Sequence, residues 1–205
     1  MVPTPPVRTP DGTLEVVTTH LELRQQPRPL RVSILSRTLA VVHAQRFPLH
    51  FYRYLYDTVG SPYLWWERRE MDDQELAAIV LDERVELHVL QVDGVPAGFA
   101  ELDRRNPEHV VLEKFGLIPD YLGQGLGLHF LGRVVDIAWR EESVQRVTVK
   151  VASTDHPRAL LIHQRIGFQA YNEVREQIDD PRGRGLFPEL DEDAPANTGP
   201  TPVQG

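Results

Sequence analysis

The chain has 205 residues, a formal net charge of −8 and no cysteine. Its length suits a single domain with a substantial core, and the absence of cysteine excludes disulfides, thiol nucleophiles and cysteine metal sites. The acidic balance argues against a nucleic-acid partner, which requires a basic face. Because no apolar run forms a signal core or approaches transmembrane length, we expect a cytoplasmic protein without a membrane partner.

Composition divides the chain into three parts. Residues 1–12 are proline-rich, and residues 179–205 combine proline and glycine with six acids against two arginines. Both segments are typical of disordered tails. We therefore expect one folded domain over residues 13–178.

Hydrophobic patterns predict the elements of this domain. Apolar and polar residues alternate over Leu14–Leu23, which predicts a strand, whereas residues 30–43 stay open between strand and helix. Half of the sixteen aromatic residues lie between positions 47 and 66, and their spacing predicts a helix that ends at Gly60-Ser61-Pro62. Further elements are a helix over 74–81 capped by Asp72 or Asp73, strands over 85–92, 95–102, 110–117 and 146–152, a helix from 155 to 167, and a last strand over 168–178.

A glycine-rich turn separates the strand over 110–117 from an apolar pattern of helical period. Gly123, Gly125 and Gly127 have no Cβ atoms, so a ligand can approach the backbone closely. Free N–H groups at the start of the following helix favour an anion such as a pyrophosphate. The turn lacks the Gly-Lys-Ser/Thr of a phosphate-binding loop, and Phe130 replaces the third glycine of a dinucleotide fingerprint.

The same segment resembles motif A of the GNAT superfamily of acyl-CoA-dependent N-acyltransferases, in which Gln/Arg-x-x-Gly-x-Gly/Ala follows a strand ending in hydrophobic-x-Pro. Leu117-Ile118-Pro119 ends the strand here, and Leu122 stands where the family prefers Gln or Arg. Residues 159–168 resemble motif B, with His163 in place of the usual tyrosine and His156 in place of a common asparagine. The resemblance covers residues 86–171.

The resemblance implies an α+β fold with a mixed, mostly antiparallel central sheet flanked by helices, and a cofactor held where two central strands splay. It also implies binding of acetyl-CoA, with the Leu117 backbone polarising the thioester. The residues that would contact the cofactor are Leu117, Ile118, Leu122, Gly123, Gln124, Gly125, Leu126, Gly127 and His156. The region between the first two strands usually shapes the acceptor site, so Tyr52, Tyr56, Trp65 and Trp66 are candidate substrate contacts. The aromatic cluster has a second interpretation, as core together with the interface of a homodimer.

Two glutamates are candidates for the base that deprotonates the acceptor amine. A hairpin symmetric about Asn106 pairs Glu101 with Val111 and Phe99 with Glu113, which places both carboxylates on one face, roughly 7–8 Å apart at the backbone. Partial desolvation and a neighbouring like charge would raise their pKa values. Otherwise one or both face solvent or pair with a nearby cation (Arg104, Arg105 or Lys114). A one-residue shift in register would separate their faces.

His163 is the third candidate catalytic residue, because the tyrosine of relatives at this position is thought to protonate the departing thiolate. A histidinium could donate that proton and is a stronger acid than tyrosine. The alternative is an ordinary helix residue. The eight histidines show no metal-ligand spacing, so we expect no metal.

The sequence therefore predicts an N-acetyltransferase that moves an acetyl group from acetyl-CoA to a primary amine, most simply of a small molecule, by direct transfer in a ternary complex. Two alternatives stay open. One is a non-catalytic acyl-CoA-binding regulatory module, and the other is an acetyltransferase acting on a protein or peptide amine.

Overall fold

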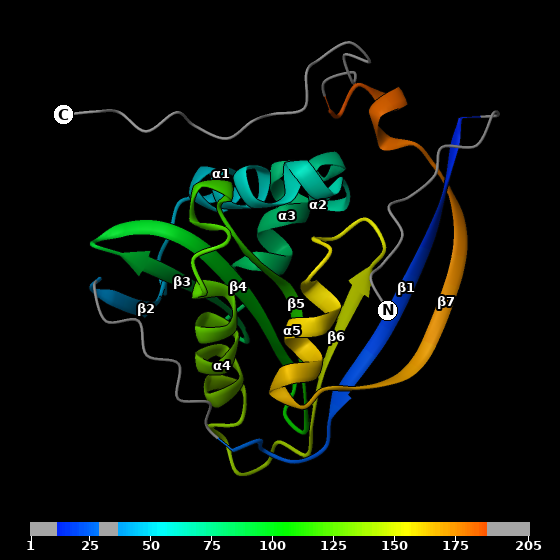
Figure 1. Cartoon of the computed structure of the whole chain (residues 1–205). Helices are drawn as coiled ribbons and strands as arrows, with labels where there is room; N and C mark the ends of the chain where they lie inside the picture. Colours follow the sequence, from blue (N-terminus) through cyan, green and yellow to red (C-terminus); the bar gives the residue numbers. More distant parts are fainter. Residues whose placement is uncertain (1–11, 29–36, 188–205) are drawn as a thin grey trace, which may run out of the picture.

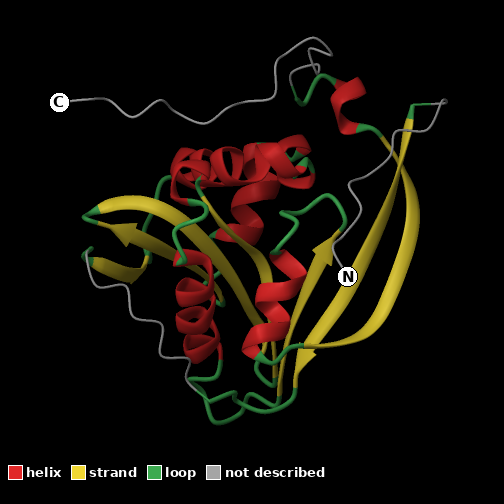
Figure 2. Ribbon diagram, in the orientation of Figure 1, coloured by secondary structure: helices red, strands yellow, loops and turns green. Residues whose placement is uncertain are grey.

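The computed structural model describes residues 12–28 and 37–187. Within these ranges one sheet has the strand order β2-β3-β4-β5-β6-β1-β7 (Figures 1 and 2). The strands are β1 (Thr13–Leu23), β2 (Leu39–His43), β3 (Val85–Val92), β4 (Val95–Asn106), β5 (His109–Leu117), β6 (Arg146–Ala152) and β7 (Gln169–Asp179). The helices are α1 (Leu49–Gly60), α2 (Glu67–Glu70), α3 (Asp73–Val80), α4 (Leu126–Ala138) and α5 (Ala159–Ile166), with 3-10 turns η1 (Ser61–Tyr63), η2 (Pro119–Tyr121) and η3 (Pro181–Arg184).

Helices cover both faces of the sheet (Figure 2). One buried cluster joins α1 and α3 to residues such as Leu87, Val89 and Phe99 on β3 and β4. A larger cluster joins α4 and the end of α5 to the opposite face, which carries Ala100 and Leu102. Because side chains alternate between faces along a strand, the central strands are apolar on both sides and form a core of three layers.

Strand β5 marks the point where the sheet opens. The sheet pairs antiparallel except between β5 and β6, which run parallel from His109 and Arg146 to Leu112 and Val149. Beyond these residues the two strands separate. The predicted mixed, mostly antiparallel sheet with two splayed central strands is therefore confirmed.

The first strand pairs in the sheet with strands that are far from it in the sequence. Strand β1 is inserted between β6 and β7 and is antiparallel to both. Thr18 stands opposite Ala152 on one side and Val174 on the other. The N-terminal strand, placed from the sequence pattern only as an isolated strand, thus forms one wall beside the splay (Figure 1).

Local sequence signals explain several element ends. Asp93 and Gly94 have φ values of 52° and 85°, as expected for the two-residue hairpin that joins β3 to β4. Asp72, rather than Asp73, caps α3 and forms a reciprocal capping box with Glu75. Gly167, with φ of 120°, follows α5 in the position that favours glycine.

The predicted register of the β4–β5 hairpin is wrong. Glu101 lies opposite Lys114, not Val111, and Phe99 lies opposite Gly116, not Glu113. The turn is centred on Pro107–Glu108, since Asn106 pairs with His109, and not on Asn106 as predicted. A bulge between Glu101 and Leu102 then changes which side chains share a face. Glu113 is the extra residue of this bulge.

The predicted start of the C-terminal tail is also wrong. Strand β7 continues through Asp179, and η3 follows it. Asp180 is buried and binds the Arg182 side chain, while Arg69 lies over the ring of buried Phe187. Residues 179–187 therefore pack against the domain. The predictions for residues 1–11 and 188–205, and for part of the open stretch 30–43, fall outside the described residues.

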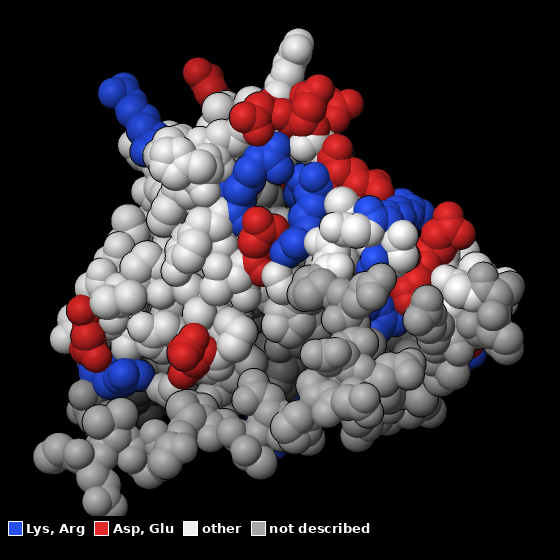
Figure 3. All heavy atoms as spheres, turned by 90° about the horizontal axis from the view of Figure 1, so that it is seen from above, with Lys and Arg blue, Asp and Glu red and all other residues white. Residues whose placement is uncertain are grey.

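Figure 3 views the molecule from the end that carries α1, α2 and η3, and shows acidic and basic side chains close together. Ion pairs account for this mixture: Arg53 pairs with Asp73, Arg69 with Asp57 and Arg184 with Glu70. This face consequently has no large patch of a single charge among the described residues.

Candidate active site

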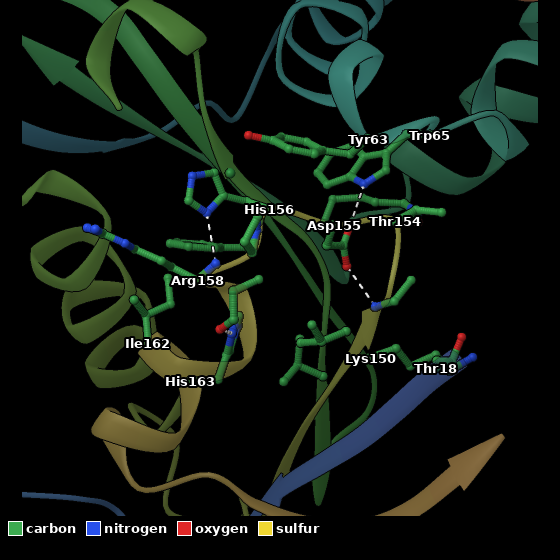
Figure 4. Close-up of a pocket in the computed structure, with 18 of the residues that line it drawn as sticks. Thr18, Tyr63, Trp65, Lys150, Thr154, Asp155, His156, Arg158, Ile162 and His163 are labelled. Carbon is green, nitrogen blue, oxygen red and sulfur yellow. Dashed lines mark hydrogen bonds between the residues drawn. The ribbon is translucent and has the colours of Figure 1, made fainter. Parts of the chain in front are cut away.

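A cleft of about 1140 Å³ passes through the splay between β5 and β6. The start of α4, the loop before α5 and α5 itself line one end. The loop from Tyr63 to Glu67, together with one face of β6, β1 and β7, lines the other. Figure 4 shows this pocket with Trp65, Asp155 and His163 around it. The two ends of the cleft, which differ in their lining residues, are thus continuous through the gap between β5 and β6.

The glycine turn forms the wall at the α4 end. Gly123 and Gly125 have φ values of 74° and 76°, and a Cβ at either position would have no heavy atom within 4 Å. Gly125 is the N-cap of α4 and provides no side-chain cap. The first N–H groups of α4 therefore have no intrahelical partner and face open space, which is the arrangement that favours an anion.

Leu117 offers a further N–H group beside this turn. The neighbouring Ile118 N–H donates to Ala97 O at 2.9 Å, toward β4. Because successive N–H groups of a strand point to opposite edges, the Leu117 N–H points toward the edge that β6 has left. Leu117 also lines the cleft. Its N–H is therefore a donor available to a ligand between the splayed strands.

The other predicted cofactor residues divide into two groups. Leu122, Gly127 and His156 line the cleft. Ile118 and Leu126 belong to the buried core, and the Gln124 side chain binds Arg37 and the Asp120 carbonyl. Next to His156, Arg158 donates its backbone N–H to the His156 Nδ1 at 3.0 Å; Arg158 and Arg165 also line the cleft and give its α5 side a positive charge.

The two predicted bases lie in different surroundings. Glu101 is 1% exposed, accepts hydrogen bonds from the Tyr52 hydroxyl and Arg68, and is absent from the cleft lining. Burial raises the pKa of Glu101, against the opposing effects of Arg68 and Tyr52. Glu113 is exposed and lines the cleft. As the bulged residue of β5, it has no partner residue on β4. Of the two, Glu113 is the one that a ligand in the cleft can reach.

His163 is buried in the cleft wall at α5, between the rings of Phe115 and Phe168. Its Nδ1 lies 2.7 Å from the Ala159 carbonyl, which can only accept, so Nδ1 carries the proton. Nε2 is buried without a hydrogen-bond partner among the described residues. Burial lowers the pKa of His163 to about 4, so the ring is neutral and Nε2 is an acceptor. This differs from the hypothesised histidinium, because within residues 12–28 and 37–187 no carboxylate acts on the ring to favour a second proton.

The predicted aromatic contacts also divide. Trp65 and Trp66 line the cleft, whereas Tyr52 and Tyr56 are 1% and 2% exposed and belong to the core under α1. The Tyr56 hydroxyl donates to Glu67 at 3.1 Å. The two tyrosines therefore lie beneath the site and hold charged residues in place.

Several cleft residues were missed by the sequence analysis. Asp155 is partly buried and accepts from Trp65 Nε1 at 3.0 Å and from the Ala152 N–H at 2.8 Å (Figure 4); desolvation raises its pKa. Lys114 lies 3.4 Å from Glu67, over the Trp65 ring. In the sequence, Asp155 precedes the α5 segment, and an aspartate at this position indicates only the start of a helix. Its contact with Trp65 spans 90 positions.

A comparison with family sequence models decides the family. A model described as the acetyltransferase (GNAT) family matches residues 52–168, which include the glycine turn, β5 and α5. The chain belongs to the GNAT acetyltransferase family. No curated protein sequence is significantly similar to it.

Solved structures agree with this GNAT assignment at the level of the fold. A GCN5-related N-acetyltransferase from Kribbella flavida has a TM-score of 0.54 at 14% identity, covering 83% of this chain and 60% of its own. One from Sphaerobacter thermophilus has a TM-score of 0.54 at 16% identity, covering 80% and 52%. The aminoglycoside N-acetyltransferase AAC(6')-Iy, solved with CoA, has a TM-score of 0.50 at 18% identity, covering 70% and 95%. The chain spans about half to two thirds of the length of four of the most similar solved structures, which include those from Kribbella flavida and Sphaerobacter thermophilus.

No helix in the described part of the chain is both long and apolar enough to cross a membrane. Among residues 12–28 and 37–187, no group of three or more histidine, aspartate or glutamate side chains is placed to hold a metal ion.

Proposed function

We propose that the protein transfers an acetyl group from acetyl-CoA to a primary amine of a small molecule. The observation that carries this proposal is the continuity of the cleft. One end offers the glycine turn, the uncapped start of α4 and the free Leu117 N–H. The other end offers the exposed carboxylate of Glu113. An anionic acyl donor and an amine could therefore meet at the splay.

The residues of the α4 end fit acetyl-CoA. The N–H groups after Gly123 and Gly125 would hold its pyrophosphate, and Arg158 and Arg165 add positive charge beside them. The Leu117 N–H would donate to the thioester oxygen, where negative charge develops during transfer. Bound acetyl-CoA would supply an activated acyl group.

Direct transfer of the acetyl group from CoA to the amine needs no covalent enzyme intermediate. The amine nitrogen forms a bond to the acyl carbon, the carbon–sulfur bond breaks, and the amine gives up one proton to Glu113. CoA leaves as a thiolate, which is a fair leaving group because thiols have pKa values near about 8.5. With no cysteine in the chain, a thiol intermediate is excluded. The neutral His163 has no proton on Nε2 to give to the sulfur, so the thiolate would leave without a general acid at this position.

Binding is tested by calorimetric titration with acetyl-CoA and CoA, using two matched variants. Gly125→Ala and Gly94→Ala place a Cβ at almost the same φ, 76° and 85°, and in both cases in open space. Both should lose similar stability, because the left-handed conformation costs a non-glycine residue roughly 1–2 kcal/mol. Only Gly125→Ala should weaken acetyl-CoA binding. Equal affinities in the two variants would contradict the placement of the cofactor.

Turnover is tested by release of free thiol across a panel of small amines and N-terminal peptides. A ternary complex predicts intersecting initial-velocity lines, whereas parallel lines would indicate a covalent intermediate. Tight CoA binding without release of thiol from any amine would favour a non-catalytic CoA-binding module. Release only with peptides would identify a protein or peptide amine as the acceptor.

A further inference from the structure

The chain contains only two lysines, Lys114 and Lys150, against twenty arginines. Both lysines line the cleft. Lys114 is already engaged, since it lies 3.4 Å from Glu67 and over the rings of Tyr56 and Trp65. Lys150 is exposed and forms neither a hydrogen bond nor an ion pair with any described residue. Lys150 is therefore the cation that a ligand in this part of the cleft could recruit.

Lys150 stands next to the candidate base across the splay. The parallel pairing of β5 and β6 ends at Leu112 and Val149, so Glu113 and Lys150 are the first residues after the separation. Neither is bridged to the other, although they carry opposite charges and line the same cleft. Two opposite charges that form no ion pair with a described residue can each receive one group of a ligand that bears both an amine and a carboxylate.

Lys150 belongs to the acceptor end rather than to the α5 end. On β6, Val147, Val149 and Val151 point into the core beside α4, so Lys150 points to the opposite face. Opposite it on β1 is His20, and Thr18 lies next along the same face. In Figure 4, Lys150 and Thr18 lie on the side of the pocket away from Arg158.

An apolar wall continues from Lys150 along the inserted strand. Leu14 and Val16 on β1, Ile178 on β7 and Trp66 in the loop before α2 all line this end of the cleft. The register places Leu14 opposite Ile178 and Val16 opposite Glu176, so a carboxylate lies at the border of the wall. This surface would remove an apolar side chain from water.

We propose that the acceptor is an α-amino acid with an apolar side chain. Its amine would lie at Glu113, its carboxylate at Lys150, and its side chain against Val16 and Ile178. This inference rests on the proposed function and narrows its substrate class. The lysine ammonium is a compact point charge that can approach a single carboxylate, whereas the guanidinium of arginine favours bidentate geometry.

The test compares ligands that differ only in the carboxylate. After a screen of the twenty amino acids by thiol release, the best apolar ones are compared with their amides and with the corresponding decarboxylated amines. For leucine these are leucinamide and 3-methylbutylamine. Because a hydrogen bond to a charged group is involved, kcat/KM for the amino acid should exceed both by roughly 10- to 100-fold.

Lys150→Met should remove this preference. It should lower kcat/KM for the amino acid by the same factor and leave the amide and amine unchanged, with an unaltered melting temperature because Lys150 is exposed. Lys150→Arg should recover only part of the loss. An equal effect of Lys150→Met on all three ligands, or no acetylation of any amino acid, would overturn the proposal. Acetylation of the simple amines alone would preserve the proposed function, whereas failure of CoA binding as well would refute both.

Discussion

Replacing His163 with phenylalanine should make the protein less sensitive to acid. His163 is fully buried, and burial lowers its pKa to about 4, against about 6.5 in an unfolded chain. The unfolded state therefore binds a proton at a higher pH than the folded state. Stability that is present above about pH 6.5 is lost as the pH falls toward 4. The two pKa values give a loss of about 2 kcal/mol between pH 8 and pH 5, and about 3 kcal/mol in full.

The assay is urea unfolding at pH 8, 6.5 and 5 for the wild type, His163→Phe and His163→Met. Each variant should gain about 2 kcal/mol relative to the wild type between pH 8 and pH 5. Other titrating groups cancel in this difference. The absolute stabilities of the two variants will differ, because phenylalanine adds volume beside Phe115 and Phe168 and methionine adapts to the space, but the change with pH should be common to both.

A stability difference that is constant with pH would refute this reasoning. It would mean that the folded protein protonates His163 as readily as the unfolded chain does, and the ring could then act as the proton donor suggested by its position in motif B. With a buried, neutral His163, kcat/KM should show no acidic limb attributable to this residue, and His163→Phe should leave the shape of the pH–rate profile unchanged.

The remaining predictions separate residues that act in the cleft from residues that support it. Glu113→Gln should lower the rate of transfer by ~10²–10⁴-fold, measured well below the pKa of the acceptor amine, with unchanged urea unfolding; an unchanged rate would exclude Glu113 as the base. Glu101→Gln should instead lower the free energy of unfolding by roughly 3–5 kcal/mol, since it leaves Arg68 buried without a counter-charge; a normal unfolding curve would contradict this. Trp65→Phe removes a donor from partly buried Asp155 and should cost about 1–3 kcal/mol, together with a raised KM for the amine, which steady-state kinetics would detect.

The local signals of the sequence determined most of the elements. Alternation of apolar residues indicates most of the strands. Asp93-Gly94 is a local two-residue hairpin signal at the turn between β3 and β4, and the glycines at 123 and 125 are where the backbone has positive φ. These features depend on a few neighbouring residues and on the allowed backbone angles of glycine, so they can be deduced without knowledge of the fold. The order strand, glycine turn and helix likewise indicated the family.

Tertiary structure decided what each candidate side chain can do. The turn at Pro107–Glu108 and the bulge at Glu113 set the β4–β5 register. They left Glu113 in the cleft and Glu101 in a buried pair with Arg68. The position of β1 between β6 and β7 brought Val16 to the acceptor end, and burial between two aromatic rings made His163 neutral. Register, strand order and burial arise from contacts between residues far apart in the chain, whose energies are set only when the core packs. Periodicity carries no information on register, strand order or burial. The sequence therefore indicated the kind of chemistry expected at the site, whereas the tertiary structure determined which of the candidate side chains line the cleft.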